Sequence, residues 1–151
     1  MKSSLSRRAA LGLGGGVVAA IVVGVPYAAL AKNDHEELIK AFTGGKAPTK
    51  GKVTLDLPEI AENGNTVPLS ISVDSPMTPD SYVKDVLVVA DGNPRGGVVT
   101  FHFTPMSGAA EASTRIRLAE TQNVIAIAKM NDGSLFMDTK PVKVTIGGCG
   151  G

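Results

Sequence analysis

Hydrophobic and polar residues alternate along most of the chain from Val53 onward, with the period of two that is typical of half-buried β-strands. From Val86 to Ala90 the alternation gives way to a continuous apolar run, which predicts a strand buried on both faces. Gly, Pro, Asn and Asp separate these segments as turns, and Asn131-Asp132-Gly133 signals a tight hairpin. The predicted strands cover residues 53–57, 67–73, 82–90, 98–104, 113–118, 123–130, 135–137 and 142–146.

The spacing of these strands, roughly 10–15 residues, predicts a mainly β fold. We expect an immunoglobulin-like antiparallel β-sandwich of about seven strands over residues 52–146. Pro141 lacks an amide hydrogen and is expected to interrupt the ladder locally, so that residues 142–146 form a last edge strand. A short amphipathic helix is predicted ahead of the sandwich, within residues 32–45, with Asp34 as its N-cap and Gly44 at its end.

The first segment of the chain (residues 1–31) is interpreted as a cleavable export signal. Three basic residues precede an uncharged run from Ala9 to Ala31, which ends in the small-x-small sequence Ala29-Leu30-Ala31. A transmembrane helix is the alternative, but Pro26 and five glycines make such a helix poor. The paired Arg7-Arg8 resembles a twin-arginine signal, which exports folded proteins. We therefore expect a periplasmic protein that is cleaved after Ala31.

Removing this segment changes the charge balance and the classes of partner that it allows. The 151-residue chain has 15 basic and 14 acidic residues, and three of the basic residues lie in the signal. The remaining 120 residues therefore carry a net charge of −2, which argues against nucleic acid or an anionic membrane as a partner. Cleavage would also leave no membrane anchor. A single cysteine excludes an intramolecular disulfide framework.

The candidate chemistry lies in the last five residues, Gly147-Gly148-Cys149-Gly150-Gly151 (residues 147–151). Because glycine has no side chain and wide backbone freedom, we expect a flexible arm that does not pack and that reaches roughly 16–18 Å. Such an arm is thin enough to carry the Cys149 thiol into a narrow cleft of another protein. No His, Lys or Arg neighbours the thiol in sequence, so the pattern predicts an attachment point rather than a self-contained catalytic nucleophile.

Two other interpretations of this cysteine remain open. It could crosslink an exported β-sandwich interaction module to a partner, or belong to a thiol enzyme. Other candidate sites are weaker, because His35 and His102 are far apart in sequence and have no ligand spacing. His102 is expected to face solvent or a partner. The methionines would suit Cu(I), but a rigid set of His and Cys ligands is missing, so neither a metal site nor a cofactor is predicted.

The terminal Gly-Gly-Cys-Gly-Gly, together with the twin-arginine signal and the all-β domain, resembles the SoxY family. Members of this family are the sulfur-carrier subunits of the periplasmic Sox system, which oxidises thiosulfate. The resemblance covers the whole chain, and the terminal pentapeptide is its specific part. Further similar segments are Ala41–Gly45, Leu57–Gly64 with Val67-Pro68, and Val73–Met77.

The resemblance implies that Cys149 covalently holds sulfur intermediates (S-thiosulfonate, persulfide and S-sulfonate) and that Gly147, Gly148, Gly150 and Gly151 form a swinging arm. It also implies a heterodimer with SoxZ, a second immunoglobulin-like subunit. A c-type cytochrome complex would couple thiosulfate to the thiol, and a hydrolase would release sulfate. The persulfide sulfur would then be oxidised by a sulfane dehydrogenase, where present, or passed to sulfur storage. The protein would then be a carrier and not an enzyme, with no cofactor beyond the bound sulfur.

The sequence does not single out the strands that would contact SoxZ. The segments Val98–Phe103 and Asn123–Met130 are apolar enough for an interface. A position in the core explains both segments equally well.

Overall fold

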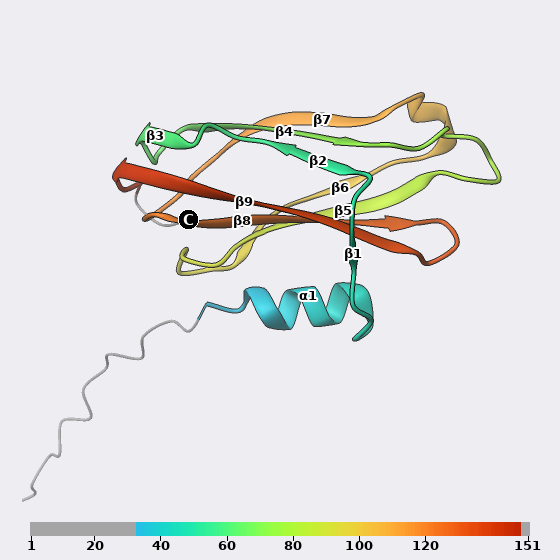
Figure 1. Cartoon of the computed structure of the whole chain (residues 1–151), viewed down its shortest axis with the longest axis horizontal. Coiled ribbons are helices and arrows are strands. Elements are labelled where there is room, and N and C mark those ends of the chain that lie inside the picture. The colour runs from blue at the N-terminus through green and yellow to red at the C-terminus, as the bar shows by residue number, and fades with distance from the viewer. Residues whose placement is uncertain (1–32, 149–151) are drawn as a thin grey trace, which may run out of the picture.

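The computed structural model describes residues 33–148, which form two packed β-sheets and one helix outside them (Figure 1). The mainly β prediction is confirmed. The expected signal (residues 1–31) and residues 149–151 lie outside the described residues. Among the described residues, no helix is long and apolar enough to cross a membrane. The elements are α1 (His35–Thr43), β1 (Thr49–Lys50), β2 (Val53–Asp56), β3 (Ile60–Asn63), β4 (Val67–Val73), β5 (Val83–Ala90), β6 (Gly97–His102), the 3-10 turn η1 (Pro105–Ser107), β7 (Ala110–Ile116), β8 (Gln122–Met130) and β9 (Leu135–Ile146).

The sandwich has a larger and a smaller sheet. The larger sheet has the strand order β1-β9-β8-β5-β6, with β3 also paired to β9, and the smaller sheet has the order β2-β4-β7. The core lies between the two sheets and includes Leu55 and Leu69 from the smaller sheet and Val86 and Val124 from the larger one. β4 alternates buried and more exposed residues as its sequence predicts, so only its inner face is covered.

Helix α1 covers the outer face of the larger sheet, below that sheet in Figure 1, and contacts β5. Leu87, Val89 and Ile127 are at most 8% exposed although they do not belong to the core between the sheets. Successive residues of a strand point to opposite faces, so these three side chains lie on the outer face. The helix therefore explains why β5 is buried on both faces, as its apolar run predicts.

The start of α1 is capped by a different residue from the predicted one. Asp34 occupies the N-cap position but makes no side-chain capping hydrogen bond. Its Oδ1 instead accepts a hydrogen bond from the Gly96 amide at 2.7 Å, while Asn33 Oδ1 accepts one from the His35 amide at 2.9 Å. The Asp34 side chain therefore contacts the loop before β6, and Asn33 supplies the local cap. Gly44 ends the helix in a left-handed conformation (φ 65), as predicted.

The prediction that Pro141 interrupts the last strand is wrong, because β9 continues through it with Pro141 opposite Asn123 of β8. β9 is also not an edge strand. It pairs in parallel with β1 at Phe136 and Met137, and with β3 from Lys143 onward. Pro141 lies between these two short pairings, a place where a residue without an amide hydrogen is tolerated. The sandwich is therefore antiparallel except for these two additional strands.

Candidate functional site

The described chain ends at the first two residues of the predicted arm. Gly147 and Gly148 follow β9 directly, at the end of the sandwich where β3 also ends (left in Figure 1). Cys149, Gly150 and Gly151 lie outside the described residues. Residues of the β3–β4 turn and the β7–β8 loop contact the two described glycines. We call the following group the arm root: Gly64, Leu118, Ala119, Gly147 and Gly148.

Backbone hydrogen bonds connect the three chain segments of the arm root. Ile146 O accepts a bond from the Gly64 amide at 2.8 Å, and Gly64 O accepts one from the Leu118 amide at 2.8 Å. Leu118 O in turn accepts a bond from the Gly148 amide at 2.9 Å, and Gly148 is buried. The structure therefore differs from the predicted arm at Gly147 and Gly148, whose backbone packs against the sandwich.

The physical reason is that glycine allows a backbone contact as well as backbone freedom. A Cβ added to Gly64 would collide with Leu118 O, and one added to Gly147 would collide with Ala119 O. A Cβ added to Gly148 would lie 2.6 Å from Gly64 O. The atoms in the way are backbone atoms, which cannot rotate aside as a flexible side chain can. The glycine-rich sequence indicates the freedom of this segment but not the distant residues that it contacts.

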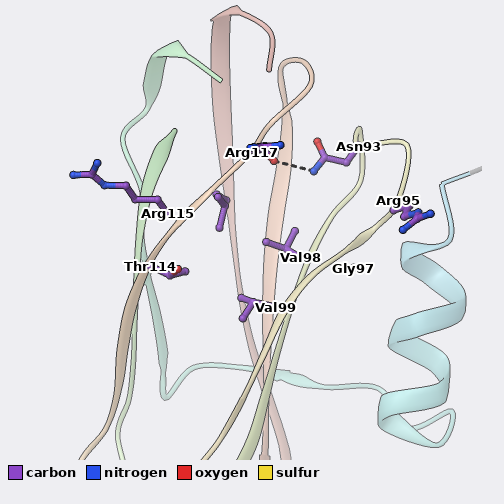
Figure 2. Close-up of a pocket in the computed structure, with 9 residues that line it drawn as sticks. Asn93, Arg95, Gly97, Val98, Val99, Thr114, Arg115 and Arg117 are labelled. Atoms are coloured by element: carbon purple, nitrogen blue, oxygen red, sulfur yellow. Dashed lines mark hydrogen bonds between the residues drawn. The ribbon is translucent and has the colours of Figure 1, made fainter. Parts of the chain in front are cut away.

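The β7–β8 loop, which receives Gly148, is fixed by a buried side chain. Asn93 is 7% exposed and donates a hydrogen bond from Nδ2 to Arg117 O at 2.9 Å (Figure 2). Its Oδ1 accepts bonds from the Ala119 amide and from Gln122 Nε2, both at 2.9 Å. Because these bonds involve the residues on both sides of Leu118, they fix the position of Leu118 O, which accepts the hydrogen bond from the Gly148 amide.

A groove of about 410 Å³ opens beside this loop, between β6 of the larger sheet and β7 of the smaller one (Figure 2). Its apolar lining comes from Val98, Val99 and Ile116. Arg95 and Arg115 line it as well, but Figure 2 shows their side chains pointing away from each other. These two guanidinium groups therefore do not converge on one anion.

The two segments considered for a partner differ in accessibility. Val98–Phe103 largely coincides with β6, which ends the larger sheet and has only half-buried and exposed residues. Asn123–Met130 lies within β8, between β9 and β5, where most residues are buried. A position in the core therefore accounts for the second segment. The first segment lies at the sheet edge, where its apolar residues are partly buried and pack against the core.

The two histidines lie on different elements, His35 at the start of α1 and His102 at the end of β6. His102 has a side chain that is 75% exposed, as expected, and its Nδ1 lies 2.6 Å from Asp85 Oδ1 on the neighbouring strand. His35 Nδ1 lies 2.7 Å from Asn33 Oδ1 at the start of α1. Within residues 33–148, no group of three or more His, Cys, Asp and Glu side chains could hold a metal ion.

The similarity of this chain to a known protein family extends to its cysteine. The model of a family described as sulfur oxidation protein SoxY matches residues 39–149, from within α1 to the cysteine. Among solved structures, the sulfur carrier protein SoxY from Chlorobium limicola f. thiosulfatophilum is similar, with a TM-score of 0.60 and 28% sequence identity. That match covers 74% of this chain and 96% of the other.

The fold also occurs in proteins with other names. Superoxide reductase (neelaredoxin) from Ignicoccus hospitalis is similar, with a TM-score of 0.56 and 17% identity, over 62% of this chain and 80% of that one. At this level of identity the likeness shows the shared fold alone. A search of curated proteins found no match.

Proposed function

This chain belongs to the SoxY family of sulfur oxidation proteins, and from that premise we propose that its Cys149 thiol carries the intermediates of thiosulfate oxidation. The observation that carries the proposal is the extent of the family match, which ends on Cys149, the single cysteine of the sequence. The similar protein from Chlorobium is itself named a sulfur carrier protein, which supports the same role.

Loading the carrier is an oxidation. The Cys149 thiol loses its proton, and its sulfur forms a bond to the outer sulfur of thiosulfate. Thiol and thiosulfate together give a cysteine S-thiosulfonate, one proton and two electrons. A c-type cytochrome complex is the proposed electron acceptor.

Unloading proceeds by hydrolysis. Water attacks the sulfone sulfur, the bond between the sulfone and sulfane sulfurs breaks, and sulfate and a proton leave a persulfide on Cys149. A sulfane dehydrogenase, where present, converts the persulfide and three waters into an S-sulfonate, releasing seven protons and six electrons. A second hydrolysis releases sulfate and restores the thiol.

The residues near the thiol suit a substrate of other enzymes better than a catalyst. No basic side chain neighbours Cys149 in sequence, so no adjacent residue of the chain is expected to activate the thiol. The described contacts of Gly147 and Gly148 in the arm root are to backbone atoms of Gly64, Leu118 and Ala119. Acid, base and electron acceptor would then come from the partner enzymes.

The proposal extends to the partner and the compartment. The chain would pair with SoxZ, leave the cytoplasm already folded through the twin-arginine pathway, and lose residues 1–31 by cleavage after Ala31. Folding before export suits a protein that must assemble with a second subunit. In the periplasm the carrier would dock transiently with the cytochrome complex, the hydrolase and, where present, the dehydrogenase.

Intact mass spectrometry of protein purified without reductant from cells oxidising thiosulfate tests this function. The wild type is expected to show masses raised by an S₂O₃ group, a sulfur atom or an SO₃ group, all lost on treatment with dithiothreitol. Cys149→Ser is expected to show none of them and to stop thiosulfate oxidation, with an unchanged thermal unfolding curve.

A matched control moves the thiol while keeping one cysteine per chain. Met106 is 96% exposed in η1, which precedes β7, whereas Leu118 and Ala119 of the arm root follow β7. Cys149→Ser combined with Met106→Cys is therefore expected to expose a thiol that stays unloaded. An unmodified thiol or only a disulfide-linked dimer in the wild type would refute the carrier and favour a crosslinking module. Turnover of a small substrate by the chain alone would favour a thiol enzyme.

A further inference from the structure

We infer that Gly64 is a positioning residue for the Cys149 thiol. With Gly147 and Gly148 it holds the base of the arm against the sandwich, so that the thiol leaves the domain from a fixed point. This inference rests on the proposed carrier function, because a fixed origin matters for a thiol that must be presented to other enzymes. Gly64 belongs to the turn between β3 and β4, far from the cysteine in sequence.

Gly64 touches both of the segments that it brings together. Its amide donates to Ile146 O and its carbonyl accepts from the Leu118 amide, each at 2.8 Å. An added Cβ would collide with Leu118 O and would also lie 2.7 Å from Gly148 N, the two atoms of the bond that anchors the arm. The added Cβ would also lie 3.0 Å from Val144 Cγ1, so it has a third close neighbour. A side chain at Gly64 must therefore displace the anchor.

The contact is reciprocal. A Cβ on Gly148 would lie 2.6 Å from Gly64 O and 2.9 Å from Asn65 N. None of Gly64, Gly147 and Gly148 has a left-handed φ, in contrast to Gly44, Gly108 and Gly133. These three positions thus require glycine for close backbone approach and not for an unusual backbone conformation.

Anchoring at Gly148 shortens the distance over which the thiol can move. The next Cα lies about 3.8 Å away across a trans peptide, so the sulfur of Cys149 stays within roughly 6–7 Å of the Gly148 Cα. A free arm of five residues would reach roughly 16–18 Å. An enzyme that acts on the thiol must therefore approach the arm-root end of the sandwich and contact it closely.

Backbone dynamics of the ¹⁵N-labelled protein test the anchor without any substitution. The order parameter of the Gly148 amide is expected to be about 0.85, like that of the β9 amides. A value below about 0.6, typical of a flexible segment, would overturn the inference.

Gly64→Ala tests whether this residue maintains the anchor, with a nitroxide attached to Cys149, the single cysteine. We expect the Gly148 order parameter to fall below about 0.6 and the nitroxide spectrum to narrow, while amides of β5 keep their values. Gly108→Ala is the control, since Gly108 has a positive φ (75) but open space around it. It introduces backbone strain away from the arm root and is expected to leave both signals unchanged. A Gly148 that stays ordered in Gly64→Ala would contradict the inference.

Gly148→Ala provides a second route if Gly64→Ala does not fold, because it changes only a residue beyond the last strand. It is expected to release the nitroxide in the same way. The double variant is expected to add little to either single change, since both break one junction. Additive effects of the two substitutions would mean that the residues act separately.

Sulfur loading in cells oxidising thiosulfate separates this inference from the function on which it rests. Gly64→Ala is expected to lower the rate of Cys149 loading roughly tenfold, whereas Gly108→Ala keeps it at the wild-type level. Normal loading despite a released Gly148 would overturn the positioning role and leave the carrier function intact. An unloaded wild type with an ordered Gly148 would refute the carrier function while the anchor remains.

Discussion

The side chain of Asn93 holds the loop on which the arm root depends. Asn93→Ala removes its hydrogen bonds to Arg117 O, the Ala119 amide and Gln122 Nε2, all 2.9 Å long. Because these hydrogen bonds are buried or partly buried, we expect the free energy of unfolding to fall by about 1–3 kcal/mol. The Gly148 amide is also expected to exchange its hydrogen faster. Urea unfolding and hydrogen exchange measure the two effects.

Asn131→Ala is the matched control for that change. Asn131 also makes side-chain bonds to two backbone groups, the Tyr82 amide at 3.1 Å and Asp80 O at 3.0 Å, but both are exposed. We expect a smaller loss of stability and no change at Gly148. Equal losses in the two variants, with unchanged exchange at Gly148, would show that Asn93 does not support the arm root.

Asp132, in the β8–β9 turn, is a carboxylate whose pKa the fold lowers from the usual 3.8. Hydrogen bonds from Ser134 Oγ at 2.6 Å and the Ser134 amide at 2.8 Å stabilise its charged form. Because the pKa is lower in the folded state, the turn contributes stability above pH 3.8 that is lost as the pH falls through the folded value. Ser134→Ala is expected to raise the pKa of Asp132 toward 3.8, as measured by carboxyl NMR titration. An unchanged pKa would contradict this cause.

At the scale of elements, the docking of α1 depends on Gly96. The Gly96 amide donates to Asp34 Oδ1, and an added Cβ would lie 2.5 Å from His35 N and 2.6 Å from its Cα. We expect Gly96→Ala to displace the start of the helix and to destabilise the protein by about 1–3 kcal/mol. Hydrogen exchange should then accelerate in α1 more than in β4.

Gly133→Ala serves as the control for the helix, because Gly133 lies in an open turn with a φ of 85 and no heavy atom within 4 Å of an added Cβ. It is expected to strain its turn and leave exchange in α1 unchanged. If α1 stays as protected in Gly96→Ala as in the wild type, the close contact does not determine its docking.

Elements with a clear hydrophobic period could be predicted from the sequence, and those that depend on distant partners could not. The alternation in β4 and the apolar run in β5 reflect burial that each strand carries in its own residues. β1 and β3 are too short for a period and exist through parallel pairing with β9. The position of Pro141 inside β9 could not be predicted for the same reason, since the strands that pair with β9 on either side determine whether a proline is tolerated.

The candidate site, too, could be predicted from the sequence only in part. Cys149 stands out in the sequence because it is the single thiol. No local pattern indicates that Gly64 meets Gly148, because this contact depends on the register of β3 against β9. The sequence therefore singles out the proposed attachment residue, and the tertiary structure determines where the segment that carries it leaves the sandwich.

For the whole molecule, the sandwich has two distinct ends. The β3–β4 turn, the β7–β8 loop and the end of β9 meet at the arm root, whereas η1 and the β8–β9 turn lie at the other end (Figure 1). A thiol tethered at the arm root would be presented at one end of the domain. Together with family membership, this arrangement supports a scaffold that offers one covalently bound cargo to successive enzymes.

Mass spectrometry of the C-terminal tryptic peptide during a pulse of thiosulfate tests the central claim most directly. Cleavage after Lys143 releases Val144–Gly151, which contains Cys149 and no other thiol. We expect the S-thiosulfonate to appear on this peptide first, the persulfide to follow, and the free thiol to return when thiosulfate is consumed. A peptide that stays an unmodified thiol, or appears only as a disulfide, while the cells oxidise thiosulfate would contradict the proposed role of Cys149.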